Sequence, residues 1–406
     1  MLVVLDTGRV LWPRLGGNKI NLGSLKQQHY AALDSLRGIC ALAVVVFHFR
    51  TTGNLTNLEF FRHSWMFVDF FFVLSGFVIA AAYGDKLQAG TVSVRRFMGL
   101  RLGRIYPLHI AMVLALLFLE LLLALFDLTA VTKREAFEGS RSLPALATNL
   151  GILHVFGLHD RLTWNIPSWS IAAEIWAYLV FAVVLKRFGH NGWQIIAALG
   201  VLAMLVLATL APRHLNATYD FGFVRCLYGF AVGTLTFRVI GKGLTIGGTM
   251  AEAAAVFACV LFVTLIEGGL ITLAAPLVFA LPVLVFARGE GYLTRVLTFR
   301  PFVWLGTISY SIYMVHGFVQ GRIGDLIQLV GEPLGLSIKA GSHDTEYPSE
   351  VLDGLPLALD ILTLIMLAMV IVTAAISYRT IERPFREMSR AMLSKPTARR
   401  KDLKTG

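Results

Sequence analysis

The sequence predicts an all-α polytopic membrane protein with about ten transmembrane helices and both termini in the cytoplasm. Three observations predict this class: an apolar composition, repeated apolar stretches of membrane-spanning length, and an uneven distribution of basic residues. Of the 406 residues, 56% are hydrophobic and 15% are charged, and the mean hydropathy is +0.69. A water-soluble fold of this length needs more polar surface than this composition supplies.

Apolar stretches close to the ~20 residues that cross the hydrocarbon core of a bilayer recur along the chain. We expect spans at residues 36–52, 65–83, 106–126, 168–185, 194–211, 221–239, 251–266, 270–287, 302–320 and 356–378. The segment 145–158 is also apolar, but it is short and contains Thr148 and Asn149. We interpret it as interfacial or re-entrant, because a full span there would invert the topology of everything that follows.

The distribution of lysine and arginine predicts the orientation, because cytoplasmic loops are enriched in these residues. The side that holds both termini carries 26 of the 36 Lys and Arg residues, and the other side carries 9. This places the N-terminal tail 1–32 and the basic tail 387–406 in the cytoplasm and the loop 321–355 outside it. The net charge of +11 then reflects topology and anionic lipid headgroups. No basic stretch is interleaved with aromatics as nucleic-acid binding requires.

Neither a disulfide nor a metal cluster is expected. Cys40, Cys226 and Cys259 all lie inside predicted spans, where cysteine behaves as a small apolar side chain. The residues before Leu33 lack the long apolar core of a cleavable signal peptide. We therefore interpret them as a cytoplasmic tail or as the result of an upstream start-codon choice.

Titratable side chains inside the spans are candidates for function, because a charge in hydrocarbon is unfavourable unless it is paired or hydrated. In the first span Arg37 and His48 are eleven residues apart. Eleven steps of ~100° bring them within ~20° of one helix face, and the rise of ~1.5 Å per residue separates them by ~16 Å. With Arg37 at the cytoplasmic interface, His48 lies near or just beyond the midplane. A satisfied core histidine is the alternative interpretation.

Two carboxylates lie in other spans. Asp69 is surrounded by phenylalanines just before Ser75 and Gly76, a small pair that also favours plain helix packing. Glu174 lies one to two turns into its span and needs a partner. The sequence leaves open whether that partner is His48, Arg37 or Arg225, or whether the pair is purely structural.

A cytoplasmic run before the third span contains Arg95, Arg96, Arg101 and Arg104. Such clusters often serve only as positive-inside anchors, but Arg101 and Arg104 share one helix face. Two guanidinium groups on one face suit a polyanionic phosphate. Near the end of the chain, Tyr313 and His316 are further candidates, although Tyr313 also fits an aromatic belt.

Six motifs together resemble the acyltransferase-3 family of integral membrane O-acyltransferases. In order they are LDSLRGICALAVVVFHF, VDFFFVLSGF, RLGRIYP, PSWSIAAEIWAYL, LGTISYSIYMVH and IERPFR. The resemblance covers residues 33–386, which we take as one membrane-embedded acyltransferase domain. Two departures are Val68, where the family usually has glycine, and the expectation that no esterase-like domain follows, so that a separate periplasmic protein completes acceptor handling or none is needed.

The resemblance implies transfer of an acyl group, usually acetyl, from cytoplasmic acyl-CoA to a hydroxyl of a glycan, glycolipid or related acceptor in the bacterial inner membrane. No cofactor would be bound permanently, because acyl-CoA is a co-substrate. We expect Arg101, Arg104 and Arg95 to bind its phosphates and His48 to act as general base. We expect Glu174 to orient or charge-balance His48, and Arg37 or Arg225 to stabilise charge on the thioester oxygen.

Two other functions fit part of the pattern. Midplane His, Glu and Arg side chains also serve secondary transporters that export a glycan, lipid or small molecule. The sequence contains no internal repeat and no matching pair of Gly/Pro-broken helices, which such transporters usually have. A membrane scaffold for binding or sensing would leave the basic cytoplasmic cluster without a use.

Overall fold

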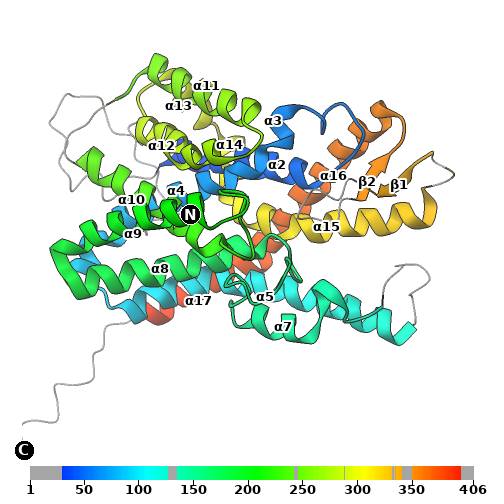
Figure 1. Ribbon diagram of the computed structural model, residues 1–406, viewed down its shortest axis with the longest axis horizontal. Coiled ribbons are helices and arrows are strands. Elements are labelled where there is room, and N and C mark those ends of the chain that lie inside the picture. Colours follow the sequence, from blue (N-terminus) through cyan, green and yellow to red (C-terminus); the bar gives the residue numbers. More distant parts are fainter. Residues whose placement is uncertain are drawn as a thin grey trace, which may run out of the picture.

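The computed structural model describes residues 30–126, 135–241, 246–287, 289–331, 333, 335–340 and 350–394. Residues 1–29 and 395–406, which make up most of the two predicted tails, lie outside the described residues, as do residues 341–349 of the predicted outer loop. The domain boundaries at 32 and 387 therefore stay predictions. The described chain is a helical bundle with one small sheet (Figure 1).

The α-helices are α2 (Ala31–His48), α3 (Glu59–Arg62), α4 (Phe67–Gln88), α5 (Val94–Phe126), α7 (Leu143–Leu150), α8 (Ser168–Phe188), α9 (Gly192–Thr209), α10 (Gly222–Gly241), α11 (Thr249–Leu265), α12 (Ala275–Phe286), α13 (Tyr292–Leu297), α14 (Arg300–Thr307), α15 (Ser309–Val330), α16 (Pro356–Ser377) and α17 (Arg383–Ser394). Short 3₁₀ turns are η1 (Ser64–Met66), η2 (Gly139–Arg141), η3 (Gly189–Asn191) and η4 (Leu270–Ala274), and η6 (Tyr378–Glu382) is a π-helix. Most of every predicted span lies on one of these helices or on two consecutive ones, although the first span, 36–52, runs four residues beyond the end of α2 at His48.

The span count is supported only in part. Among the described residues, six helical stretches are long and apolar enough to cross a membrane, or seven when α14 and α15, which meet at a 65° bend, form one broken span. One of the six, Ser168–Thr209, contains both α8 and α9, and two shorter apolar helices lie at Thr249–Leu265 and Leu270–Phe286. The chain is thus a helical membrane protein, while ten spans and the side of the termini stay predictions.

The segment 145–158 does not form a long helix. Helix α7 has eight residues and ends at Leu150, so at ~1.5 Å per residue it rises only ~12 Å. Irregular chain follows until α8 begins at Ser168. This length agrees with the interfacial or re-entrant interpretation.

Small residues hold the centre of the bundle together. A Cβ added at Gly76 of α4 would lie 2.1 Å from the carbonyl oxygen of Phe230, and one added at Gly233 of α10 would lie 1.8 Å from that of Val73. Glycine at both positions lets the two backbones touch, which is how helices associate where no hydrophobic effect drives them. The packing interpretation of Gly76 is therefore correct.

The all-α prediction misses one element. Strands β1 (Ser337–Ala340) and β2 (Glu350–Asp353) form an antiparallel pair inside the predicted outer loop 321–355. Leu352 of β2 exchanges backbone hydrogen bonds with the chain just after α2, at Arg50 and Thr52. Strands of four residues leave almost no alternation in the sequence, and this pairing also depends on a segment 300 residues away.

Loops that the basic-residue count assigns to the same side of the membrane lie together at the same end of the bundle. At one end α17 lies along the first part of α5 (Figure 1), which joins the predicted cytoplasmic segments 84–105 and 379–394. At the other end, residues after α2 meet Arg213, Glu267 and Val351 around one cavity, all from predicted outer loops. The two groups of loops are therefore consistent with each other, whichever end faces the cytoplasm.

Candidate active site

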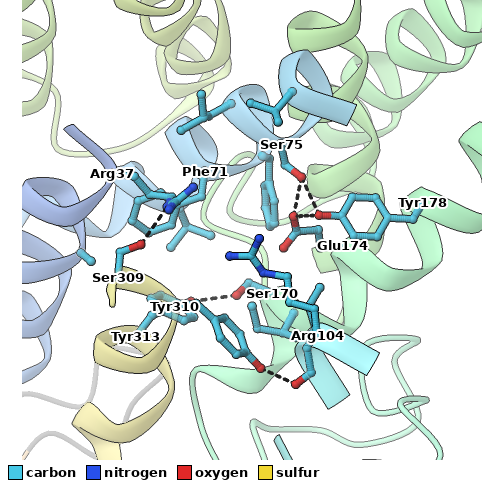
Figure 2. A pocket seen from close by; sticks show the side chains of 17 residues that line it. Arg37, Phe71, Ser75, Arg104, Ser170, Glu174, Tyr178, Ser309, Tyr310 and Tyr313 are labelled. Atoms are coloured by element: carbon cyan, nitrogen blue, oxygen red, sulfur yellow. Dashed lines mark hydrogen bonds between the residues drawn. The ribbon is translucent and has the colours of Figure 1, made fainter. Parts of the chain in front are cut away.

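A cavity of about 90 Å³ lies between α2, α4, α5, α8 and α15. Its wall is mainly apolar, with a few converging polar side chains (Figure 2). These are Arg37, Ser75, Arg104, Ser170, Glu174, Tyr178, Ser309, Tyr310 and Tyr313. A concave apolar site with few convergent polar groups is the usual form of a binding or active site.

Arg37 is fixed at the cavity wall by three contacts. Its Nε donates to Ser309 Oγ at 2.7 Å, its Nη2 donates to the carbonyl oxygen of Gly306 at 2.7 Å, and its Nη1 lies 2.9 Å from Asp34 Oδ1. Ser309 Oγ donates to the same carbonyl at 2.8 Å, at the bend between α14 and α15. A Cβ at Gly306 would lie 2.2 Å from the backbone oxygen of Asp34, so glycine lets α14 approach α2 closely enough for the bond.

Glu174 has different partners from those expected. Ser75 Oγ and Tyr178 OH both donate to Glu174 Oε1, and the two hydroxyls lie 2.8 Å from each other (Figure 2). The predicted contact between Glu174 and His48 is not formed. Tyr178 follows Glu174 by one helical turn, and α4 supplies Ser75, so tertiary packing selects hydroxyls as the partners. Ser75 is therefore more than a packing residue.

Arg104 points into the cavity from α5 (Figure 2). Its Nη2 lies 3.6 Å from Glu382 Oε1, and Ser311 donates to the other oxygen of that carboxylate at 2.9 Å. The side chains of Arg104 and Glu382 are 7% and 0% exposed. Sequence reasoning missed Glu382, although an acidic residue directly after the last apolar span is a detectable signal.

The three arginines expected to bind phosphate differ in environment. Arg95 is exposed, whereas Arg101 and Arg104 are buried. Arg101 Nη2 donates to Tyr83 OH at 3.0 Å, and its guanidinium lies over the rings of Tyr83 and Phe97. Only Arg104 of the three lines the cavity.

His48 ends α2 and does not line the cavity. Its ring centroid lies 4.9 Å from that of His316, and the His316 ring lies 5.6 Å from the Tyr313 ring in the cavity wall. Three rings thus connect the cavity to His48. Arg37 and His48 share a helix face as the spacing predicts, but only Arg37 reaches the cavity, because ~16 Å of helix separates them.

The hydrogen bonds of the two histidines assign their tautomers. His48 Nδ1 lies 2.9 Å from the carbonyl oxygen of Val44, and His316 Nδ1 lies 2.6 Å from that of Tyr313. A carbonyl oxygen only accepts, so in each neutral ring Nδ1 carries the hydrogen and Nε2 holds a lone pair. His316 Nε2 is buried and has no hydrogen-bond partner among the described residues, so it is able to accept a proton. The same tautomer makes Nε2 the basic nitrogen of the His48 ring.

Asp69 and Arg225 form a pair away from the cavity. Arg225 Nη2 and Nε donate to the two Asp69 oxygens at 2.6 and 3.0 Å, and the side chains are 1% and 0% exposed. The guanidinium also lies over the rings of Trp65 and Trp169. This bidentate pair joins α10 to α4, and neither residue lines the cavity.

A second, larger cavity of about 470 Å³ lies at the opposite end of α2. Phe47 and Phe49, the neighbours of His48 in the chain, belong to its wall. Its polar lining consists of Arg50, Thr51, Thr56, Asn57, Arg62, His63, Arg213, Asn216 and Glu267. His48 therefore lies between an arginine-lined cavity and a roomy polar one.

A family profile described as an acyltransferase domain matches residues 30–378. The chain belongs to the acyltransferase-3 family. The match covers the main helices of both cavities and ends at Tyr378, the first residue of the π-helix η6, so α17 lies beyond it. The family resemblance expected from the six motifs is thus confirmed.

Relatives of this acyltransferase-3 protein carry related names. It is 25% identical over 384 residues to acyltransferase MdmB of Streptomyces mycarofaciens, covering 87% of this chain and 90% of that protein. It is 22% identical over 324 residues to peptidoglycan O-acetyltransferase OatA of Listeria monocytogenes, covering 71% of this chain and 49% of that protein. The chain thus spans about half the length of that relative. "Protein 2 in picA locus" of Rhizobium radiobacter is 31% identical over 195 residues, covering 45% of this chain and 96% of that protein. No solved structure matches the chain.

Proposed function

We propose that this protein transfers an acyl group, in the first place acetyl, from acyl-CoA to a hydroxyl of a glycan or glycolipid, with His48 as general base. The observation that carries the proposal is the position of His48 between two cavities of different chemistry. The names of the relatives, peptidoglycan O-acetyltransferase and acyltransferase, support the reaction class. A multi-pass protein of the bacterial inner membrane, with the arginine-lined cavity toward the cytoplasm, fits this reaction.

The arginine-lined cavity suits the donor. Arg37 and Arg104 supply two guanidinium groups to a mainly apolar wall, which suits the uncharged arm of a donor whose polyanionic head lies close by. Glu174 lies close enough to Arg37 to attract it electrostatically. We therefore assign Glu174 as a positioning residue that balances these cations, in place of the expected direct contact with His48.

The larger cavity suits the acceptor. Hydroxyl and amide side chains from Thr51, Asn57 and Asn216 lie there beside three arginines and the ring of Trp65. Saccharides are bound by such hydrogen-bonding groups around an apolar face. An acceptor hydroxyl that enters from this side reaches the His48 end of α2 without passing the donor's charged head.

The chemical step uses the lone pair on His48 Nε2. The acceptor hydroxyl attacks the thioester carbonyl carbon while His48 Nε2 takes the hydroxyl proton, and the C–S bond breaks. The products are an O-acyl ester and the CoA thiolate, which receives the proton from His48. Because Arg37 is held ~16 Å from His48 along the helix, we assign it to donor binding and not to the carbonyl under attack. His316, with a second Nε2 lone pair between His48 and the donor cavity, extends the path of the proton.

The experiment uses purified protein in nanodiscs with acetyl-CoA and a glycan acceptor. Thiol release from CoA and acetyl incorporation into the glycan are measured together. The proposal expects both to appear in equal amounts and both to depend on His48. Movement of a glycan or lipid across the bilayer without thioester consumption would instead identify a transporter.

A further inference from the structure

Helix α17 contributes a buried arginine face that lies beyond the residues matched by the family profile, although Arg386 belongs to the IERPFR motif. Glu382, Arg386 and Ser389 are buried, and Arg390 is partly buried, so these positions form one face of the helix. Arg383 and Glu387 lie on the exposed face and pair with each other at 2.9 Å. The matched family region ends at residue 378.

Glycines of α5 let the buried face of α17 pack closely beside the two arginines of the RLGR motif. A Cβ added at Gly103 would lie 2.3 Å from Ser389 Cβ, and one added at Gly99 would lie 2.9 Å from a methyl carbon of Leu393. The four-residue spacing of these glycines makes a groove on α5 for α17, as small residues do between membrane helices. Arg101 and Arg104 flank Gly103 in the sequence, so the packing brings four arginines together.

Four guanidinium groups lie close together in this cluster. Arg101, Arg104, Arg386 and Arg390 lie close enough to repel one another, and Glu382 is in ion-pair contact with Arg104. Glu382 already binds Arg104 and Ser311. Like charges held close together in a poorly hydrated region repel one another, and an anion bound among them is attracted to all of them.

Arg386 has donors left for such an anion. Its Nη2 donates to Tyr378 OH at 3.1 Å, and its guanidinium lies over the Tyr378 ring. Arg386 is only 6% exposed, and its buried Nε and Nη1 have no hydrogen-bond partner among the described residues. Nε and one Nη are the edge of a guanidinium that binds a phosphate in a bidentate manner.

We propose that Arg386 and Arg390 of α17, together with Arg101, form the site for the phosphate groups of the donor. The proposal rests on the proposed acyl-CoA donor. Arg104 places the site beside the arginine-lined cavity, because it contacts Glu382 on one side and lines the cavity on the other. The phosphates then bind between α5 and α17, and the pantetheine arm with its thioester enters the cavity past Arg104.

The test compares Arg386→Gln with Arg383→Gln in the full-length protein. Both changes remove one positive charge from α17, but only Arg386 carries the unpartnered buried donors. We expect the Kd for acetyl-CoA to rise about 10- to 100-fold in Arg386→Gln and to change less than twofold in Arg383→Gln. Arg386→Lys should recover part of the loss, because it restores charge without the fork. An unchanged Kd in Arg386→Gln would overturn the assignment.

Two further measurements separate ligand binding from folding and from lipid. The melting temperature of ligand-free Arg386→Gln should equal or exceed that of the parent protein, because two buried N–H donors without partners are removed, whereas a structural arginine would lower it. The acetyl-CoA affinity should fall equally in nanodiscs of neutral and of anionic lipid. Stabilisation of the parent protein by anionic lipid alone, with Arg386→Gln insensitive to it, would identify a lipid headgroup as the ligand and overturn the donor assignment.

Inorganic pyrophosphate distinguishes this inference from the proposed function. If the parent protein binds no acyl-CoA, the donor proposal fails as a whole, and so does this assignment to the donor. If pyrophosphate still raises the melting temperature of the parent protein but not of Arg386→Gln, the phosphate-binding chemistry of Arg386 is supported by itself. If neither ligand changes the melting temperature, the site is not an anion site.

Discussion

Two buried arginine–carboxylate pairs in this protein differ in how completely the arginine is hydrogen-bonded. Arg225 donates to both oxygens of Asp69 and to the backbone, and its guanidinium lies over two tryptophan rings. Arg104 reaches Glu382 only at 3.6 Å and lines a cavity. A saturated pair is a structural connection between helices, whereas an unsaturated one beside a cavity is prepared for a ligand. Buried charge alone therefore does not identify a functional residue in this membrane domain.

The largest effect on folding is expected at the saturated pair. Asp69→Ala leaves the Arg225 guanidinium buried without a counter-charge, which costs about 3–5 kcal/mol. We expect a strong fall in melting temperature and in the yield of monodisperse protein. The double substitution Asp69→Leu with Arg225→Met should recover most of the stability, since it removes both charges. A normally stable Asp69→Ala protein that has lost transfer activity would contradict the structural assignment.

The next largest effect is expected on donor binding at the pair of Arg104 and Glu382. Arg104→Ala combined with Glu382→Gln avoids an unpaired carboxylate, and we expect it to raise the Kd for acetyl-CoA about 10- to 100-fold. Glu382→Gln alone is the control, because it keeps the guanidinium in the cavity. Equilibrium binding to purified protein measures both. Equal affinities in the double variant and its control would return Arg104 to a structural role.

A smaller effect is expected at Glu174. Glu174→Gln keeps the volume and removes the charge that attracts Arg37, so we expect a several-fold rise in the KM for acetyl-CoA at a partly hydrated site. The kcat should change little, since the carboxylate does not contact His48. A fall in kcat of about 100-fold or more, with KM unchanged, would restore the original expectation that Glu174 supports the base.

The smallest effect is expected at Arg95. This side chain is exposed, whereas Arg101 one and a half turns later is buried. We expect Arg95→Ala to change acetyl-CoA affinity less than twofold, because a solvated single charge contributes little. Arg101→Ala in the same assay should weaken binding about tenfold or more. Equal losses in the two variants would remove the distinction between surface and buried arginines.

The sequence predicts the helices well. Apolar length places each expected span on a helix, and the eleven-residue spacing correctly sets Arg37 and His48 on one face. The partners of the polar groups were not predictable, because they are chosen by tertiary packing. Asp69 meets Arg225 from 156 positions away, and Glu174 meets hydroxyl groups where a cation was expected.

Two parts of the site were missed for identifiable reasons. Glu382 and Arg386 belong to the IERPFR motif, which the sequence analysis used for the family resemblance without assigning a role to either residue. Their inward face is visible only once α17 packs on Gly99 and Gly103 of α5. The strands β1 and β2 were missed because four-residue strands give too short an alternation. Helix periodicity is a local property, whereas both of these features depend on distant contacts.

The measurement that tests the central claim most directly is single-turnover acyl transfer by His48→Gln. Glutamine keeps a hydrogen-bonding side chain of similar size but does not accept a proton at neutral pH. With saturating acetyl-CoA and glycan acceptor, we predict a fall in the transfer rate of about 100- to 10,000-fold, with the Kd for acetyl-CoA and the melting temperature close to those of the parent protein. Transfer at a near-parental rate by well-folded His48→Gln would contradict the general-base assignment.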